Sequence, residues 1–139
     1  MISLDAHAKV NLTLEVVGRR ADGYHEVVSI IQTIDLHDTL MFEESSDVAL
    51  VIDGATLDMP RNLVLRAAAL LKDATGCDRG ATITLEKRVP VAAGLGGGSS
   101  DAAAALVGLE RLWGLGLRHE ELATLAKCLG SDVPFFLHG

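Results

Sequence analysis

The chain has 139 residues, of which 49% are hydrophobic and 22% are charged, and its formal net charge is −7. This length and composition are typical of a single globular domain with a substantial core. The acidic balance argues against nucleic acid as the main partner, because a phosphate backbone is bound by a basic surface. An anionic small molecule would need local backbone N–H groups, a basic patch or a metal ion to offset this charge.

Neither a membrane span nor a signal peptide is expected. The sequence has no uninterrupted apolar run of about 18 residues, and its first residues lack a basic stretch followed by an apolar one. Cys77 and Cys128 have no metal-ligand spacing. They could pair if the fold brought them together, but reduced thiols are commoner in a cytoplasmic protein, which is the location we expect.

The first half of the chain has the pattern of β-strands. Apolar and polar residues alternate over residues 8–17, and residues 26–34 are rich in Val and Ile. Shorter strand candidates follow at residues 39–43 and 48–52. Strands in such close succession, with a turn pair at Asp22 and Gly23 between the first two, predict antiparallel pairing.

The second half is mostly helical. Asn62 is a candidate N-cap for a helix that runs to about Lys72, and residues 81–87 alternate like a further strand. Apolar residues at helical spacing predict helices over residues 101–113 and 120–129. Strands first and helices mostly later predict the α+β class, with an antiparallel-rich sheet packed against helices.

The stretch from residue 91 to residue 106 is VAAGLGGGSSDAAAAL, in which glycines lead directly into a predicted helix. The N-terminus of a helix carries unpaired N–H groups and a partial positive charge. Glycines beside it let a ligand approach the backbone closely, so the segment predicts a phosphate site. The hydroxyl groups of Ser99 and Ser100 could bind a phosphate oxygen or a magnesium ion.

The spacing of this segment excludes two common phosphate loops. A P-loop has lysine after its last glycine, whereas Ser99 follows Gly98 here. The dinucleotide fingerprint needs glycine at its sixth place, which counted from Gly94 is Ser99. The alternative to a phosphate site is a plain glycine linker before a helix. Asp101 is interpreted as a helix-capping residue, because its carboxylate would repel a phosphate.

The glycine-rich segment, with Pro90 before it, resembles the second signature of the GHMP kinases. Three further stretches resemble one branch of that superfamily, which phosphorylates a cytidine diphosphate ester of methylerythritol in non-mevalonate isoprenoid synthesis. They are AHAKVNLTLEVVGRRADGYHEVVSIIQTIDLHDTL at residues 6–40, RNLVLRAAALL at residues 61–71 and GSDVPFFLHG at residues 130–139. The resemblance implies a fold like domain 2 of ribosomal protein S5.

The chain departs from the family pattern at two places. His7 stands where the family usually has proline, at the entry to the first strand. Family members also continue beyond the position of Gly139 into a second domain. Residues 1–139 are therefore expected to be the N-terminal, ATP-binding domain, with the C-terminal domain absent, and to show poor turnover and a tendency to associate when alone.

The resemblance implies transfer of the γ-phosphoryl group of ATP to the 2-hydroxyl of the methylerythritol moiety, with Mg²⁺ between the phosphates. Asp132 matches the catalytic aspartate and would act as general base, although its residue type alone fits a turn or cap. Lys9 would lie near Asp132 and stabilise negative charge, whereas a lysine on a strand is otherwise usually solvated.

The resemblance also assigns binding residues. Asn11, on the strand face of Lys9, would contact substrate, Tyr24 would stack on the cytidine ring and His25 would bind its edge, although each could simply pack or satisfy backbone. Ser100 is the candidate metal ligand. The implied nucleotide-binding residues are Pro90, Val91, Ala92, Ala93, Gly94, Leu95, Gly96, Gly97, Gly98, Ser99, Ser100, Lys87 and Leu63, of which Leu63 fits a core position equally well and Lys87 a surface lysine.

Two alternatives to the cytidine-substrate kinase stay open. One is a GHMP kinase acting on another small alcohol, and the other is a non-catalytic module with the same S5-like topology. The partner we expect is a small-molecule substrate, with no nucleic acid and no membrane, and the sequence says nothing about the oligomeric state.

Overall fold

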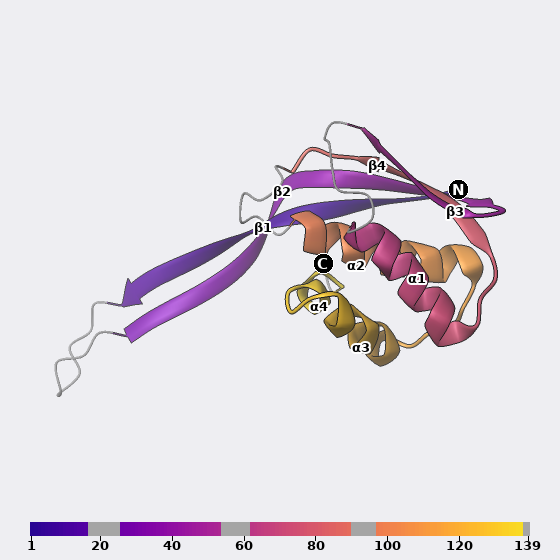
Figure 1. Cartoon of the computed structure of the whole chain (residues 1–139). Coiled ribbons are helices and arrows are strands. Elements are labelled where there is room, and N and C mark those ends of the chain that lie inside the picture. Colours follow the sequence, from indigo (N-terminus) through magenta and orange to yellow (C-terminus); the bar gives the residue numbers. More distant parts are fainter. Residues whose placement is uncertain (17–25, 54–61, 90–96, 138–139) are drawn as a thin grey trace.

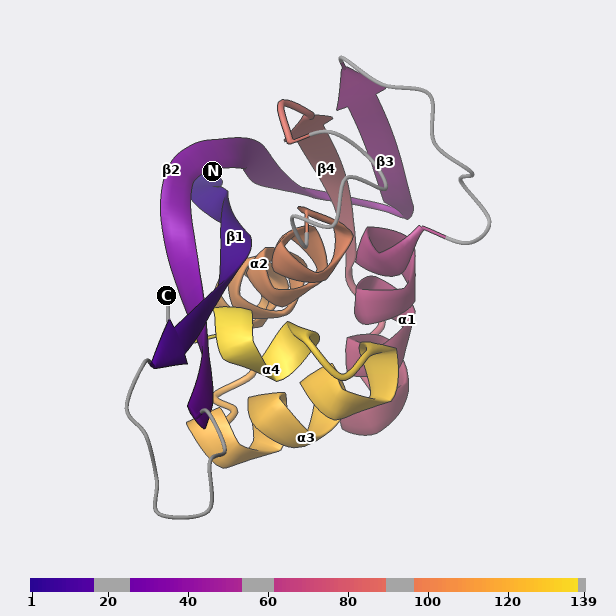
Figure 2. The same ribbon diagram turned by 90° about the vertical axis from the view of Figure 1, so that its left-hand side faces the viewer.

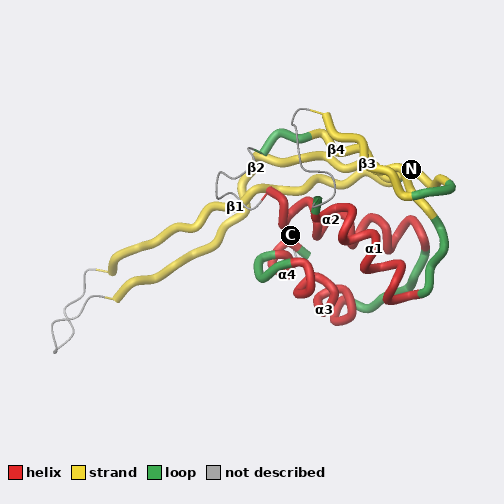
Figure 3. Tube along the Cα trace, in the orientation of Figure 1, coloured by secondary structure: helices red, strands yellow, loops and turns green. Residues whose placement is uncertain are grey.

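The computed structural model describes residues 1–16, 26–53, 62–89 and 97–137. A four-stranded sheet forms one layer, and all the helices of the described part lie against one of its faces (Figures 1 and 3). The predicted α+β class is therefore confirmed. In chain order the elements are β1 (Ile2–Val16), β2 (Glu26–Ser45), β3 (Val48–Asp53), α1 (Leu63–Thr75), β4 (Gly80–Glu86), α2 (Gly97–Trp113), α3 (His119–Leu129) and α4 (Val133–Phe136).

The strand order in the sheet is β1-β2-β4-β3. The pairs β1–β2 and β2–β4 are antiparallel as predicted, but β3 pairs with β4 in parallel. The parallel pair arises because α1 lies between these two strands in the chain and carries it back across the sheet. Figure 2 shows α1, α2 and α3 packed together on the covered face.

The predicted strands at residues 26–34 and 39–43 are in fact one strand, β2, of 20 residues. A register shift interrupts its ladder with β1: His7 pairs with His37, whereas Lys9 pairs with Thr33. One residue of β1 thus faces three of β2, and extra residues in a ladder bend and twist the strands. Beyond this irregularity the paired ends of β1 and β2 project away from the helices (Figure 1).

The helices confirm most of the predicted boundaries. Asn62 caps α1, because its side-chain oxygen accepts a hydrogen bond of 2.8 Å from the Val64 N–H. Helix α2 differs, since it begins at Gly97, four residues before the predicted start at Asp101. Helix α4 was not predicted. No helix in the described ranges is both long and apolar enough to cross a bilayer.

The core lies between the covered face of the sheet and α2. Leu40 and Phe42 of β2 are fully buried against the alanine-rich face of α2. Gly108 allows this close packing, because a Cβ atom there would lie 2.4 Å from the Phe42 ring. The small residues of α2 therefore set how closely the helix approaches the sheet, and with it the position of its N-terminus.

Candidate active site

The side chains of Lys9 and Asp132 form an ion pair, with 2.9 Å between Lys9 Nζ and Asp132 Oδ2. Lys9 comes from β1, immediately after the register shift, and its side chain is only 7% exposed. Asp132 is 53% exposed and so remains accessible to a ligand. The expectation that these residues lie together is confirmed, and the alternative of a solvated lysine on the outer face is wrong.

Asp132 occupies the N-cap position of α4, yet its side chain makes no capping hydrogen bond. Its carboxylate instead binds Lys9, and Pro134 near the helix start removes one N–H that would need a cap. The interpretation of Asp132 as a capping residue is therefore correct for its backbone position and wrong for its side chain. The carboxylate is oriented by an ammonium group while one side stays open to solvent.

The N-terminus of α2 lies close to β1 and α4, the strand that carries Lys9 and the helix that follows Asp132, and it carries hydroxyl and N–H groups. Ser100 is 3% exposed, and it lines a pocket together with His7 of β1 and Phe136 of α4. These neighbours belong to the strand that carries Lys9 and the helix that follows Asp132. The start of α2 therefore lies among the elements that position the ion pair.

Leu63 begins α1 beside the start of α2. A Cβ atom at Gly98 would lie 3.8 Å from Leu63 Cδ1, so the N-termini of α1 and α2 are neighbours. Leu63 is half-buried and packs against the core, which confirms the core position predicted for it as the alternative to nucleotide contact. Gly98 is exposed and Ser99 half-buried, which leaves the backbone at the helix start accessible.

Several of the predicted site residues cannot be placed. Tyr24 and His25 lie outside the described residues, as do Pro90, Val91, Ala92, Ala93, Gly94, Leu95 and Gly96. Asn11 lies in β1 opposite Ile31, but its side chain is outside the described part. Gly97 is the first residue of α2.

The side chain of Lys87 is only 5% exposed, which excludes the alternative of a surface lysine. Its Nζ lies 2.6 Å from Asp38 Oδ2 and 3.1 Å from Asp101 Oδ2. We call these three residues the Asp38 cluster. The capping interpretation of Asp101 is wrong, because α2 begins four residues earlier and turns this carboxylate into the interior.

The charges of the Asp38 cluster depend on one another. Burial raises the pKa of Asp101 to about 8, the interaction with Asp38 adds to this effect and Lys87 only partly opposes it. Burial would also raise the pKa of Asp38, but hydrogen bonds from its neighbours outweigh burial and hold it below its ordinary value. Burial would lower the pKa of Lys87, yet Asp38 and Asp101 raise it. One ammonium group thus lies between two buried carboxyl groups whose pKa values are shifted in opposite directions.

Asp38 is the residue of this region that sequence reasoning missed. It lies in the stretch IDLHDTL, between two predicted strands, where a polar residue is ordinarily part of a turn. The available signal was an aspartate immediately before an alternating strand segment, which is too common to single out a buried charge. Among the described residues, no group of three or more His, Cys, Asp or Glu side chains has the arrangement of a metal site.

Comparison with known proteins identifies the family. The family model described as "GHMP kinases N terminal domain" matches residues 62–139. Proteins named 4-diphosphocytidyl-2-C-methyl-D-erythritol kinase are similar over nearly the whole chain. The one from Symbiobacterium thermophilum is 56% identical over 98% of this chain and 49% of its own length, and that from Pelotomaculum thermopropionicum is 53% identical over 100% and 50%. The chain thus spans about half the length of these curated relatives.

Solved structures of similar proteins agree with the family model. A crystal structure of 4-(cytidine 5'-diphospho)-2C-methyl-D-erythritol kinase is 46% identical with a TM-score of 0.77, and it is matched over 99% of this chain and 49% of its own. Mevalonate kinase from Methanococcus jannaschii shares the fold at 20% identity and a TM-score of 0.66, over 92% of this chain and 45% of its own. Because the family model covers more than half of the residues and the relatives exceed 50% identity, this chain belongs to the GHMP kinase family.

Proposed function

We propose that the protein of which this chain forms the nucleotide-binding part transfers the γ-phosphoryl group of ATP to the 2-hydroxyl of 4-diphosphocytidyl-2-C-methyl-D-erythritol. The observation that carries the proposal is the ion pair of 2.9 Å between buried Lys9 and half-exposed Asp132. The names of the relatives support the substrate. The chain spans about half the length of these relatives.

In the proposed reaction the Asp132 carboxylate accepts the proton of the substrate hydroxyl. The hydroxyl oxygen then forms a bond to the γ-phosphorus while the bond from that phosphorus to the β-γ bridging oxygen breaks, and ADP leaves. Lys9 Nζ binds the carboxylate and is proposed to stabilise negative charge on the transferring group. Phosphoryl transfer needs positioning and charge stabilisation more than covalent catalysis, which suits a site with one acid and one ammonium group.

The proposed ATP site is the N-terminus of α2 with the glycine-rich segment before it. Exposed Gly98 presents backbone without a side chain, and N–H groups at a helix start favour phosphate oxygens. Local N–H groups of this kind also offset the net charge of −7. Leu63 lies beside Gly98 and would border the adenine base of ATP. Lys87 would lie near the same base.

Mg²⁺ fits this site as an ion held mainly by ATP phosphates. It prefers oxygen ligands and commonly takes only one or two from protein, and the Ser100 hydroxyl at the helix start is of that type. When bound, the ion would neutralise phosphate charge. Asn11, Tyr24 and His25 are proposed to bind the cytidine and methylerythritol portions. The compartment we propose is the cytoplasm.

The test is transfer of radiolabelled phosphate from ATP to three alcohols: the cytidine diphosphate substrate, mevalonate and homoserine. We expect labelled product with the cytidine substrate alone, at a low rate because the chain supplies part of the site. Binding of each compound is measured by calorimetry in parallel. Preferential binding of another alcohol would favour a different GHMP kinase. A chain that binds neither ATP nor any alcohol would favour a non-catalytic module.

A further inference from the structure

The two elements that flank the glycine-rich segment in the chain, β4 and α2, meet in the same buried cluster. Residues 87–89 leave β4 just before the segment, and Asp101 lies in α2 just after it. Lys87 Nζ lies 2.6 Å from Asp38 and 3.1 Å from Asp101, so one ammonium group joins the two flanks through side chains that are at most 5% exposed. The cluster thereby joins the end of β4 to the first turns of α2.

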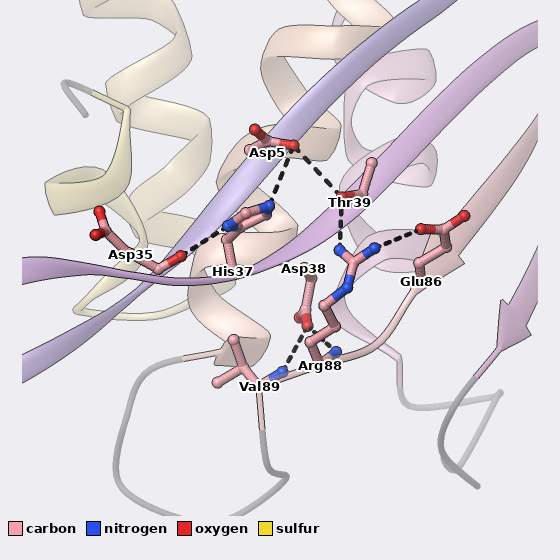
Figure 4. Close-up of polar contacts among 8 residues, drawn as sticks. All are labelled: Asp5, Asp35, His37, Asp38, Thr39, Glu86, Arg88 and Val89. Carbon is pink, nitrogen blue, oxygen red and sulfur yellow. Dashed lines mark hydrogen bonds and ion pairs between the residues drawn. The ribbon is translucent and has the colours of Figure 1, made fainter.

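Asp38 is the centre of this arrangement. Its Oδ1 accepts hydrogen bonds from the backbone N–H groups of Arg88, at 2.6 Å, and Val89, at 2.8 Å (Figure 4). Its Oδ2 accepts from Lys87 at 2.6 Å. One fully buried side chain on β2 therefore binds three consecutive residues that lead into the glycine-rich segment.

Stability alone is a weak explanation for such a cluster. Removing charges from water costs free energy that their mutual attraction often fails to exceed, and apolar residues of similar volume are often at least as stabilising. Burial of Asp101 also lowers the stability of the fold, because its Oδ1 has no hydrogen-bond partner among the described residues. Directional bonds between charged groups do provide something that apolar packing lacks, namely a fixed register between β2, the end of β4 and α2.

We propose that Asp38 is a positioning residue for the nucleotide: through residues 87–89 and the ion pairs of Lys87 it fixes the start of α2 relative to the end of β4, so that the N–H groups at the α2 N-terminus are held in place for the phosphates. This inference rests on the function proposed above. Pre-organised donors bind an anion more tightly than donors that must first be ordered, because the ordering entropy is not lost on binding. Asp38 acts only through the backbone and Lys87, and it does not touch the ligand.

A control is available at the exposed guanidinium of Arg88. The Arg88 guanidinium binds Glu86 Oε2 at 2.8 Å and Thr39 Oγ1 at 2.9 Å (Figure 4). Glu86 is 40% exposed, and exposed ion pairs contribute little free energy. Asp38→Asn and Glu86→Gln thus make the same chemical change at two carboxylates that bind Arg88, one inside the cluster and one outside it.

The experiment compares the 139-residue chain with its Asp38→Ala, Asp38→Asn and Glu86→Gln variants. Hydrogen–deuterium exchange is measured without ligand, and affinity for a non-hydrolysable ATP analogue with Mg²⁺ by calorimetry. Asp38→Ala is expected to raise exchange over residues 87–101, to leave α3 unchanged, and to weaken analogue binding about tenfold or more, since it removes hydrogen bonds to a charged acceptor. Asp38→Asn keeps an acceptor oxygen and should be intermediate, and Glu86→Gln should match wild type.

Wild-type exchange and wild-type affinity in Asp38→Ala would overturn the inference and leave the proposed function intact. If Asp38→Ala does not fold, Asp38→Asn decides by the same two readings, with unchanged values again contradicting the role of Asp38. Uniformly raised exchange, α3 included, would mean that Asp38 serves general stability only and would also overturn the inference. A wild-type chain that binds no ATP analogue would overturn the proposed function and the positioning role together.

Discussion

Lys9 and Asp132 are 123 positions apart in the sequence, yet their side chains meet at 2.9 Å. The register shift between β1 and β2 comes immediately before Lys9, and the short helix α4 begins immediately after Asp132. Two local irregularities therefore present the two charges to each other. This relationship is the structural basis for the proposal that the site takes part in phosphoryl transfer.

Replacing either partner of this ion pair should greatly reduce phosphoryl transfer. For Asp132→Asn and Lys9→Ala we expect losses of about 10²- to 10⁴-fold, the range for removal of a general base or a charge-stabilising group. Lys127→Ala, an exposed lysine of α3, is the control and should transfer phosphate at the wild-type rate. The assay is product formation with radiolabelled ATP, with circular dichroism to verify folding. Near-normal transfer in either folded variant would exclude the role assigned to that residue.

Tyr24→Ala tests the proposed cytidine site. Stacking of a base on an aromatic ring contributes about 1–3 kcal/mol, so affinity for the cytidine diphosphate substrate should fall roughly 5- to 150-fold. Affinity for the ATP analogue should stay constant, which makes the nucleotide an internal control. Calorimetric titration of both ligands measures the two effects. Equal loss of both affinities would indicate a structural role for Tyr24. Unchanged affinity for the cytidine diphosphate substrate would show that Tyr24 does not bind the cytidine.

Two glycines of α2 should respond in opposite ways to alanine. At Gly108 a Cβ atom would lie 2.4 Å from the buried Phe42 ring, so Gly108→Ala should lower the free energy of unfolding by about 1–3 kcal/mol. At Gly98 the nearest atom would be Leu63 Cδ1 at 3.8 Å, an ordinary contact, so stability should be kept while ATP-analogue binding weakens. Urea unfolding and calorimetry measure the pair. Stable Gly108→Ala protein would contradict the described packing of α2 on β2.

Asp101→Asn should change how stability depends on pH. The pKa of Asp101 is raised to about 8, chiefly by burial, so the folded chain binds this proton more tightly than the unfolded chain does. Its contribution is fully present below about pH 4 and is lost as the pH rises toward about 8. Asparagine has no such proton, so wild type should lose unfolding free energy relative to Asp101→Asn across that range.

Urea unfolding at several pH values measures this difference. Asp73→Asn, at an exposed aspartate of α1, is the matched control and should follow the wild-type curve. Parallel curves for wild type and Asp101→Asn would show that burial does not hold the proton on Asp101.

Local patterns predicted the elements well where a single physical signal dominates. The alternation of apolar and polar residues predicted β4. Asn62 predicted the start of α1, because its side chain satisfies a helix N–H group that has no other local partner. Helix α2 begins at Gly97 rather than at the predicted Asp101, because glycine and serine have low helix propensity and do not by themselves indicate a helix start.

The site depends on contacts between distant residues, which local patterns do not contain. The approach of Lys9 to Asp132 was expected only from a family resemblance, and on residue type alone Asp132 fits a turn. Asp38 was missed because its three donors come from residues 87–89, about 50 positions later in the chain. Burial of a charge is decided by the whole sheet and helix layer, so a single-residue signal could not reveal it.

The central claim is that the N-terminus of α2 holds the ATP phosphates in front of the pair formed by Lys9 and Asp132. Its most direct test is a crystal structure with a non-hydrolysable ATP analogue, Mg²⁺ and the cytidine diphosphate substrate. The account predicts phosphate oxygens within hydrogen-bond distance of N–H groups at the start of α2, and the substrate 2-hydroxyl within that distance of the Asp132 carboxylate. A triphosphate bound elsewhere, or a 2-hydroxyl remote from Asp132, would contradict it.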